Sequence, residues 1–449
     1  MTPALLLAAA ACTFSHDTLV RGHTLLKPLP QGFVNLFNLE EQLKLGYVPE
    51  VLEFFRNASA RRSLDSTRGS RILGQALLES GQFSAALPYL ERAHAEEGRI
   101  ASRAESAWML SQSHYLLGDF TSSARWGRIA HSEGHGVPEG WILFLDSLGP
   151  RRPYGGVPPG SPLVATARFG RPDLLRIPVR VNAGSSDDFV LDSGASLSLL
   201  TETAAKRFQV ERVPDAVAAA YGLHRVELRM TFAWAKTLQI GGLVLQDVPF
   251  GILPDDALAF QTQHTGEFHF DGVLGAHLMK EFDWQLDYRT KRIRAIRLDP
   301  VAPRGGKGQN VFFRRLKPMV RASFNQEPWF LFLLDTGSEP TMVTRGGLRR
   351  SNTRELEGNY PMTIEGIGKS RVSWAKLSNA SVGVERYMVL FKDIVVREES
   401  EGIEDGVLGS SFLANFDAEL RFSAMTLKLE RPQERYLREK EAIDAAAPR

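Results

Sequence analysis

The spacing of hydrophobic positions changes once along the chain. From about residue 35 to residue 148 they recur at helical intervals, as in the stretch 85–93, and short turns containing Gly separate the stretches. Beyond residue 162 they alternate with polar positions, as at Ile177, Val179 and Val181, which is the period of a half-buried strand. The pattern predicts a multidomain α + all-β protein in which the helices come first.

Proline and glycine mark the expected boundaries. They crowd the stretches 149–162 and 300–310, which cannot hold a helix or a central strand. The predicted division is a signal segment at 1–12, a tether at 13–34, helical repeats at 35–148, a linker at 149–162, two β lobes at 163–299 and 311–431 joined by a linker at 300–310, and a charged tail at 432–449.

The helical part repeats itself. Gly46, Gly81 and Gly118 stand 35 and 37 residues apart, each just before a Tyr or Phe. This resembles tetratricopeptide repeats, whose period is close to 34 residues. The resemblance implies about three stacked helix pairs that bind a protein or peptide. A plain bundle of helical hairpins is the alternative.

The β part is duplicated. Apolar runs lead into Asp192-Ser193-Gly194 and into Asp335-Thr336-Gly337, and the same five residues, Asp-Gly-Val-Leu-Gly, follow at 271–275 and at 405–409. Trp-Ala-Lys also occurs in both copies, at 234–236 and 374–376. We expect two similar lobes that meet so that Asp192 and Asp335 face each other across a water. The alternative is a pair of surface turns, which Asp-Ser-Gly and Asp-Thr-Gly form readily.

These four motifs, in this order, resemble the aspartic protease superfamily, and the two short lobes resemble a fused retropepsin dimer. The resemblance covers residues 163–431 and implies that Asp192 and Asp335 are catalytic. It also implies that two hydroxyls bond across the lobes, that two glycines let the backbone approach the acids, and that a third hydroxyl favours the ionised form of its acid. These supporting residues are Ser193, Thr336, Gly194, Gly337 and Ser338.

The chemistry of such a pair follows from electrostatics. Two carboxyl groups close together cannot both ionise easily, so one keeps a proton while the other acts as a base. The base activates water and the acid polarises the peptide carbonyl. In the family a glycine-bearing hairpin about 30 residues after each Asp closes over the substrate. Tyr221 and Gly222 in the first lobe, and Gly366 and Gly368 in the second, are candidates for such flaps, although simple hairpin turns would explain them too.

Composition narrows the function. The protein has 43% hydrophobic and 24% charged residues and a net charge of +2, which is typical of a soluble globular protein and gives no support to a nucleic-acid partner. His-Glu-x-x-His and Gly-x-Ser-x-Gly are both missing from the sequence, so a zinc or serine hydrolase is unsupported. We expect no metal and no cofactor.

The single cysteine, Cys12, excludes intramolecular disulfides. It follows a run of leucines and alanines, which resembles a bacterial secretory signal ending in a lipobox. The resemblance implies lipidation of Cys12 and a place in the cell envelope, with the lipid anchor as the one contact with a membrane. Missing basic residues before this run and Ala9 in place of Leu depart from the pattern.

Two functions fit the sequence. The first is an aspartic endopeptidase that cleaves polypeptides, with the helical repeats as a protein-binding module. Deletion of residues 35–148 should then leave cleavage of small peptides intact but impair cleavage of a protein substrate. The second is a non-catalytic scaffold in which the lobes form a protease-like clamp on a peptide.

Overall fold

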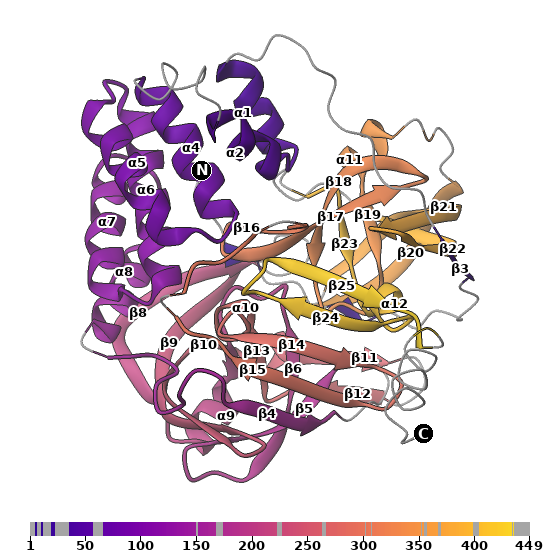
Figure 1. Ribbon diagram of the computed structural model, residues 1–449. Coiled ribbons are helices and arrows are strands. Elements are labelled where there is room, and N and C mark those ends of the chain that lie inside the picture. Colours follow the sequence, from indigo (N-terminus) through magenta and orange to yellow (C-terminus); the bar gives the residue numbers. More distant parts are fainter. Residues whose placement is uncertain are drawn as a thin grey trace, which may run out of the picture.

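The computed structural model of the chain has a stack of helices on one side and two groups of strands beside it (Figure 1). The expectation of helices followed by a β part is confirmed. The residues described are 5–6, 10–11, 19–22, 36–56, 66–149, 151–167, 174–221, 227–262, 266–300, 302–306, 308–351, 353, 357–366, 370–397, 404–432 and 434. Among them, no helix is long and apolar enough to cross a membrane.

The helices form hairpins that close on left-handed glycines. Gly46, Gly81 and Gly118 have φ of 86°, 83° and 79°, a conformation that residues with a Cβ rarely adopt. Each of these glycines lies in the turn between the two helices of one pair. The helices are α1 (Leu36–Lys44), α2 (Val48–Arg56), α4 (Thr67–Glu79), α5 (Phe83–Glu96), α6 (Ile100–Leu117), α7 (Phe120–Ser132) and α8 (Glu139–Leu148).

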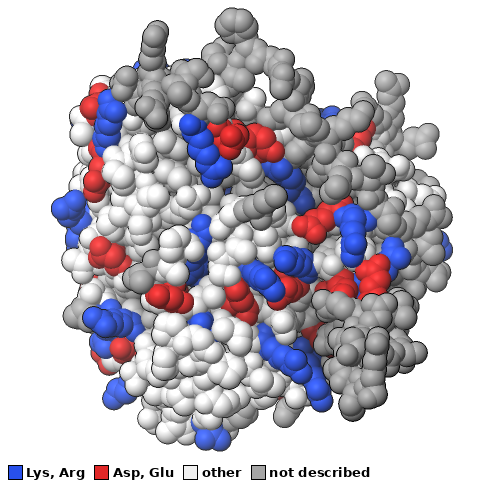
Figure 2. Space-filling model, in the orientation of Figure 1, with Lys and Arg blue, Asp and Glu red and all other residues white. Residues whose placement is uncertain are grey.

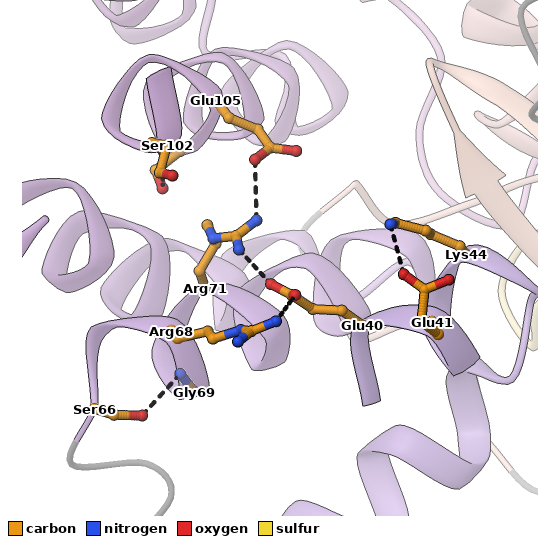
Figure 3. A network of polar contacts seen from close by, with 10 residues as sticks. Glu40, Glu41, Lys44, Ser66, Arg68, Gly69, Arg71, Ser102 and Glu105 are labelled. Carbon is orange, nitrogen blue, oxygen red and sulfur yellow. Dashed lines mark hydrogen bonds and ion pairs between the residues drawn. The ribbon is translucent and has the colours of Figure 1, made fainter. Parts of the chain in front are cut away.

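Neighbouring hairpins are joined by buried apolar side chains and by a polar network (Figure 3). Glu40 on α1 pairs with Arg68 and Arg71 on α4, and Arg71 also reaches Glu105 on α6 at 2.9 Å. Burial alone would raise the pKa of Glu40, but the two guanidinium groups hold it below its ordinary value. The network therefore ties three helices together while its carboxylate stays ionised.

The two lobes have the same strand order. In lobe 1 it is β8-β9-β10-β7-β13-β6-β5, and in lobe 2 it is β20-β21-β22-β19-β23-β18-β17, with β16 beyond. A further pairing, β9 with β5 or β21 with β17, curls each sheet towards a barrel. The duplicated sequence therefore folds as a duplicated structure.

The strands of lobe 1 are β5 (Arg176–Val181), β6 (Ser186–Asp192), β7 (Leu199–Thr201), β8 (Glu211–Tyr221), β9 (Glu227–Ile240), β10 (Leu243–Leu253) and β13 (Gly272–Gly275). A separate pair is β11 (Ala259–Thr262) and β12 (Gly266–His269). The strands of lobe 2 are β16 (Val311–Arg314), β17 (Lys317–Phe324), β18 (Glu327–Leu334), β19 (Met342–Thr344), β20 (Glu357–Gly366), β21 (Ser370–Val384), β22 (Tyr387–Arg397) and β23 (Gly406–Leu408).

Short helices occur at equivalent positions in the two lobes. Thr201 and Thr344, each nine residues after an acid turn, cap α9 (Glu202–Arg207) and α11 (Arg345–Arg350). In each cap the Thr hydroxyl accepts a backbone N–H from three residues on, which satisfies a donor that the helix leaves unpaired. The remaining short helices are η3 (Asp255–Leu258), α10 (Ala276–Met279) and α12 (Ser410–Leu413).

A five-stranded sheet joins the lobes. Lobe 1 contributes β4 (Pro162–Thr166), β14 (Phe282–Asp287) and β15 (Arg292–Arg297), and lobe 2 contributes β24 (Asp417–Arg421) and β25 (Thr426–Glu430). The two lobes meet where β14 and β24 pair antiparallel. This sheet holds the lobes in one orientation.

The helical stack packs directly on both lobes. Against lobe 1, Phe144 of α8 stacks on Phe232 of β9 with ring centroids 4.4 Å apart. Against lobe 2, Arg314 pairs with Glu79 of α4 at 2.7 Å and Arg321 pairs with Glu50 of α2 at 2.9 Å. The helices are thus part of one packed body, which does not fit a separate module.

The two predicted linkers are packed as well, which corrects their description as simple boundaries. Tyr154 in 149–162 is buried, and its hydroxyl lies 2.9 Å from His277 Nδ1. Arg304 in 300–310 is buried and donates to the Lys280 carbonyl at 2.7 Å. Both segments therefore contain residues packed into the protein interior, despite their many prolines and glycines.

Three short strands come from the N-terminal stretch: β1 (Leu5–Leu6), β2 (Ala10–Ala11) and β3 (Leu19–Gly22). They pair with β8, β20 and β22 respectively. Cys12 and most of the charged tail lie outside the described residues. On the face shown in Figure 2, the described basic and acidic side chains are interspersed.

Candidate active site

Each acid stands at the end of a central strand. Asp192 ends β6, and Asp335 directly follows β18. The Asp-Gly-Val-Leu-Gly boxes supply the parallel neighbours: Gly275 of β13 pairs with Asp192, and Leu408 of β23 pairs with Leu334. Because strands on both sides are hydrogen-bonded to the acid-bearing strand, the position of each acid is set by the sheet.

The backbone of each turn holds one oxygen of its own acid. Asp192 Oδ1 accepts the N–H groups of Gly194 at 2.8 Å and Ala195 at 3.0 Å. Asp335 Oδ1 accepts the N–H of Gly337 at 3.0 Å. Hydrogen bonds of this kind favour the ionised form of a carboxyl. The two turns therefore hold their acids in the same way, but Asp192 accepts two backbone N–H groups and Asp335 accepts one.

The hydroxyls of the two turns bond across the lobes. Ser193 N–H donates to Thr336 Oγ1 at 3.0 Å, and Thr336 N–H donates to Ser193 Oγ at 3.1 Å. Each hydroxyl also donates to a carbonyl of the opposite lobe, Ser193 to Leu334 and Thr336 to Leu191, both at 2.6 Å. These four buried bonds couple the turns directly.

The glycines bring the two acids together. A Cβ on Gly194 would lie 2.4 Å from Asp335 Cγ, and a Cβ on Gly337 would lie 2.3 Å from Asp192 Cγ. Each carboxyl group thus rests on the glycine of the opposite turn, at a distance that only a residue without a side chain permits. Both acids are fully buried, which excludes the alternative of surface turns.

Burial raises the pKa of both acids, because charge is costly away from water. The pKa of Asp192 is raised to about 6, even though its backbone donors and Lys317 favour the ionised form. The pKa of Asp335 is also raised well above its ordinary value, by burial and then by the neighbouring charge of Asp192. The pair titrates as a unit. In its singly protonated state, the two backbone N–H groups that donate to Asp192 favour the negative charge on Asp192.

The expected role of Ser338 is not what the structure shows. Its hydroxyl donates to the carbonyl of Pro340 at 3.0 Å, and not to Asp335. The sequence motif could not reveal this, because a hydroxyl in a tight turn has several backbone acceptors within reach. Ser338 therefore shapes the turn and does not favour the ionised form of the acid.

The acids of the two boxes have structural partners. Asp405 Oδ2 accepts the N–H of Leu331 at 2.8 Å and pairs with Arg350 at 2.5 Å. Asp271 pairs with Arg207 at 3.1 Å. These contacts anchor the boxes behind the acid turns.

The flap candidates fall at the tips of two long hairpins. Tyr221 ends β8 and Gly366 ends β20, while Gly222 and Gly368 lie outside the described residues. The β8–β9 and β20–β21 hairpins occupy equivalent places in the two sheets.

Two buried groups near the acids escaped the sequence motifs. Lys317 of β17 interacts electrostatically with both Asp192 and Asp335, and Tyr288 of the β14–β15 turn interacts with Asp335. A signal for Lys317 was present, since a lysine stands directly before the apolar Pro318, Met319 and Val320, 18 residues before Asp335. In the parts of the chain that the structure describes, no cluster of three or more His, Cys, Asp or Glu side chains could hold a metal ion.

Two solved structures resemble this one distantly. An aspartic proteinase from Irpex lacteus is 10% identical, with a TM-score of 0.38, over 61% of this chain and 98% of its own. A retropepsin-like aspartic protease from Rickettsia conorii is 15% identical, with a TM-score of 0.22, over 30% of this chain and 91% of its own. Because both TM-scores are below 0.5, these two likenesses carry no argument about the fold. The description of two similar lobes depends on the strand order and the acid turns of this chain alone.

No curated protein sequence matches the chain. A family model does, over residues 177–278, a span that contains the first acid turn and the first Asp-Gly-Val-Leu-Gly box. The model is that of the aspartyl proteases. In this span of lobe 1, the chain is similar to the aspartyl protease family.

Proposed function

We propose that this protein is an aspartic endopeptidase whose catalytic pair is Asp192 and Asp335. One observation carries the proposal: each carboxyl group is buried against the glycine of the opposite turn, so two acids from separate lobes share one site. Both acids are buried and have raised pKa values, and within the part of the chain that the structure describes neither forms an ion pair, so a purely structural use is hard to assign to them. They suit a reaction that needs a base and an acid together.

In the proposed reaction the Asp192 carboxylate takes a proton from a water molecule as the water oxygen bonds to the peptide carbonyl carbon. The Asp335 carboxyl gives its proton to the carbonyl oxygen, so a neutral tetrahedral diol forms. The protonated Asp192 then gives its proton to the peptide nitrogen while the Asp335 carboxylate takes a proton from one diol hydroxyl. The C–N bond breaks, a carboxylic acid and an amine leave, and the pair returns to its starting protonation state. Asp192 is assigned the base because its carboxylate accepts two backbone N–H groups.

The test is digestion of a mixed peptide library between pH 3 and pH 8, with and without pepstatin. Wild type should cleave, and Asp192→Asn and Asp335→Asn should each lose cleavage by about 100-fold or more. Asp256→Asn, at an exposed acid of η3, is the matched control and should cleave like wild type. If wild type binds library peptides but releases no products at any pH, the non-catalytic clamp is the correct function.

For the helices we propose a tetratricopeptide-like module that binds a protein, substrate or partner, on its solvent side. The repeated left-handed glycines and the paired helices support this. Replacing exposed Ile100 at the start of α6 with Glu should weaken cleavage of a bound protein substrate while cleavage of short peptides is unchanged. Equal rates on both substrates in the variant would argue against binding at this place.

We also propose export to the bacterial envelope with a lipid on Cys12, on the sequence pattern described above. Expression of the full chain and of Cys12→Ser in a bacterium tests it. The lipid reading predicts a mature wild-type chain that begins at a modified Cys12 by mass spectrometry and partitions with membranes. An unmodified intact N-terminus on wild type would contradict it.

A further inference from the structure

Lys317 is a cation inside the protein. It is the first residue of β17, it is 4% exposed, and apolar residues of the same strand follow it. Lysine is almost never this buried unless something compensates its charge. The groups around Lys317 should therefore include the negative charge that compensates its ammonium group.

The strand register places Lys317 beside the second acid. β17 and β18 are antiparallel, and Met319 pairs with Leu333. Extending this register by two residues aligns Lys317 with Asp335, which directly follows β18. Residues opposite each other in an antiparallel pair project from the same face. The register thus sets the ammonium group on the side of the sheet that carries the acid.

At the equivalent position the first lobe has an apolar residue. There Arg176 pairs with Val190 in β5 and β6, so the same extension sets Leu174 opposite Asp192. Leu174 is buried and apolar, and it precedes Asp192 by 18 residues, just as Lys317 precedes Asp335. At this position the duplicated unit therefore carries a buried charge in lobe 2 and a buried apolar side chain in lobe 1.

The asymmetry complements the hydrogen bonds. Asp192 Oδ1 accepts two backbone N–H groups, whereas in the second turn Gly337 donates to Asp335 and the Ser338 hydroxyl turns to Pro340. A cation beside Asp335 offsets the weaker set of donors there. The charge on Lys317 favours the ionised form of both acids, while the backbone donors favour Asp192 as the ionised member of the pair.

Other charged groups also act on Lys317. Burial lowers the pKa of Lys317 to about 8; Glu404 opposes this most strongly, then Asp335 and Asp192, while Arg397 adds to the lowering. Glu404 is itself 3.9 Å from Arg397. Tyr288 faces Asp335 from lobe 1. Below about pH 8 Lys317 therefore carries a positive charge that acts on both acids.

We propose that Lys317 is a positioning residue for the proton of the acid pair: its buried ammonium group favours ionisation and extends the singly protonated state of the pair to lower pH. The proposal rests on the proposed peptidase function, because the singly protonated pair is the active form. It gives the enzyme a more acidic working range than two buried carboxyls would have alone.

The first experiment compares pH profiles of kcat/KM for wild type, Lys317→Met and Lys317→Arg, with Leu174→Met as the matched control in lobe 1. Loss of the cation should move the acid limb of the Met variant up by about one pH unit. The Arg variant should keep the limb within a few tenths of a unit of wild type, and so should Leu174→Met. A folded Met variant with the wild-type profile, or an Arg variant shifted as far as Met, would overturn the proposal.

The second experiment needs no activity, so it separates this proposal from the peptidase function. Urea unfolding is measured from pH 3 to pH 8 for wild type, Lys317→Met and Lys317→Gln, each with and without Asp192→Asn plus Asp335→Asn. The fall in stability caused by the pair should extend about one pH unit higher in the Lys317 variants and disappear when both acids are replaced. Unchanged curves in both Lys317 variants, or failure of both to fold, would overturn the proposal, whereas the expected shift in an inactive protein would refute only the peptidase.

Discussion

Ser193 and Thr336 each donate a backbone N–H to the other's hydroxyl oxygen, across two lobes and 143 residues of chain. Each hydroxyl uses its own proton on a carbonyl of the opposite lobe. All these groups are buried, so each depends on the other lobe for its hydrogen bonds. The relationship makes the acid pair a property of the assembled lobes.

Replacing Thr336 with Val should therefore destabilise the protein. Val has nearly the same shape but leaves the Ser193 N–H and the Leu191 carbonyl buried without partners, at a cost of about 2–4 kcal/mol. Urea unfolding at pH 7 measures the loss. Thr336→Ser keeps the hydroxyl and should lose less than about 1 kcal/mol; equal losses in Ser and Val would show that the methyl group matters and the hydrogen bonds do not.

Replacing Asp192 with Asn should stabilise the protein at neutral pH, the reverse of most buried polar substitutions. The folded-state pKa of Asp192 is about 6, above its ordinary value of 3.8. Between these values the folded chain holds a proton that the unfolded chain has released, so stability falls as pH rises from about 4 to about 6. At pH 7 the loss amounts to up to about 3 kcal/mol, which Asn avoids. Unfolding curves at pH 3.5 and pH 7 should show the gain at pH 7 only.

The activity should decline on the acid side near pH 6. The base of the pair must be ionised, and the pKa of Asp192 is raised by burial to about 6. Below that pH, kcat/KM should fall about tenfold per pH unit. A profile measured between pH 3 and pH 8 with one short substrate checks this; a maximum at pH 3 to 4 would contradict the raised pKa.

Replacing Gly337 with Ala should abolish most activity. The new Cβ would lie 2.3 Å from Asp192 Cγ, so the carboxyl or the turn must move. Misplacement of a catalytic group by about 1 Å costs on the order of 100-fold in rate. Gly242→Ala is the control, since a Cβ there meets nothing within 4 Å. Comparable activity in both variants would contradict the close seating of the acids.

Replacing Glu281 with Gln should unfold part or all of the protein at neutral pH. Glu281 is buried beside Lys280 and pairs with Arg297 at 2.7 Å, and these cations, together with Arg304, hold its pKa at about 2 against the effect of burial. Its contribution is present above pH 4.5 and is lost as pH falls to about 2. Removing the charge leaves buried cations uncompensated, a cost of about 3–5 kcal/mol. Glu96→Gln, in an exposed pair with Arg92, should cost at most about 0.5 kcal/mol by the same urea unfolding measurement.

The interface between helices and lobes changes one expectation from the sequence. Deletion of residues 35–148 would expose Phe232 and leave Arg314 and Arg321 without Glu79 and Glu50. We therefore expect the truncated chain to be unstable, so that cleavage of small peptides is not preserved. Periodicity shows that a helix has an apolar face, but not which surface covers it.

The sequence by itself determined what depends on neighbouring residues. Helical and alternating periods predicted the two kinds of structure, and the repeated apolar run, acid, hydroxyl and glycine predicted both turns and their symmetry. The left-handed glycines between the helices also depend on the local sequence alone, because only glycine adopts that conformation at little cost.

The tertiary structure decided what depends on residues far apart in the chain. It set β14 against β24, supplied the Ser193–Thr336 bonds that the resemblance implied, turned the Ser338 hydroxyl towards Pro340, and gave the strand registers whose extension aligns Lys317 with Asp335 and Leu174 with Asp192. The residue types at these positions can be read from the chain, but which of them meet depends on how whole strands pair. The acid turns could be read from the chain, whereas the charge that surrounds them could be seen only after folding.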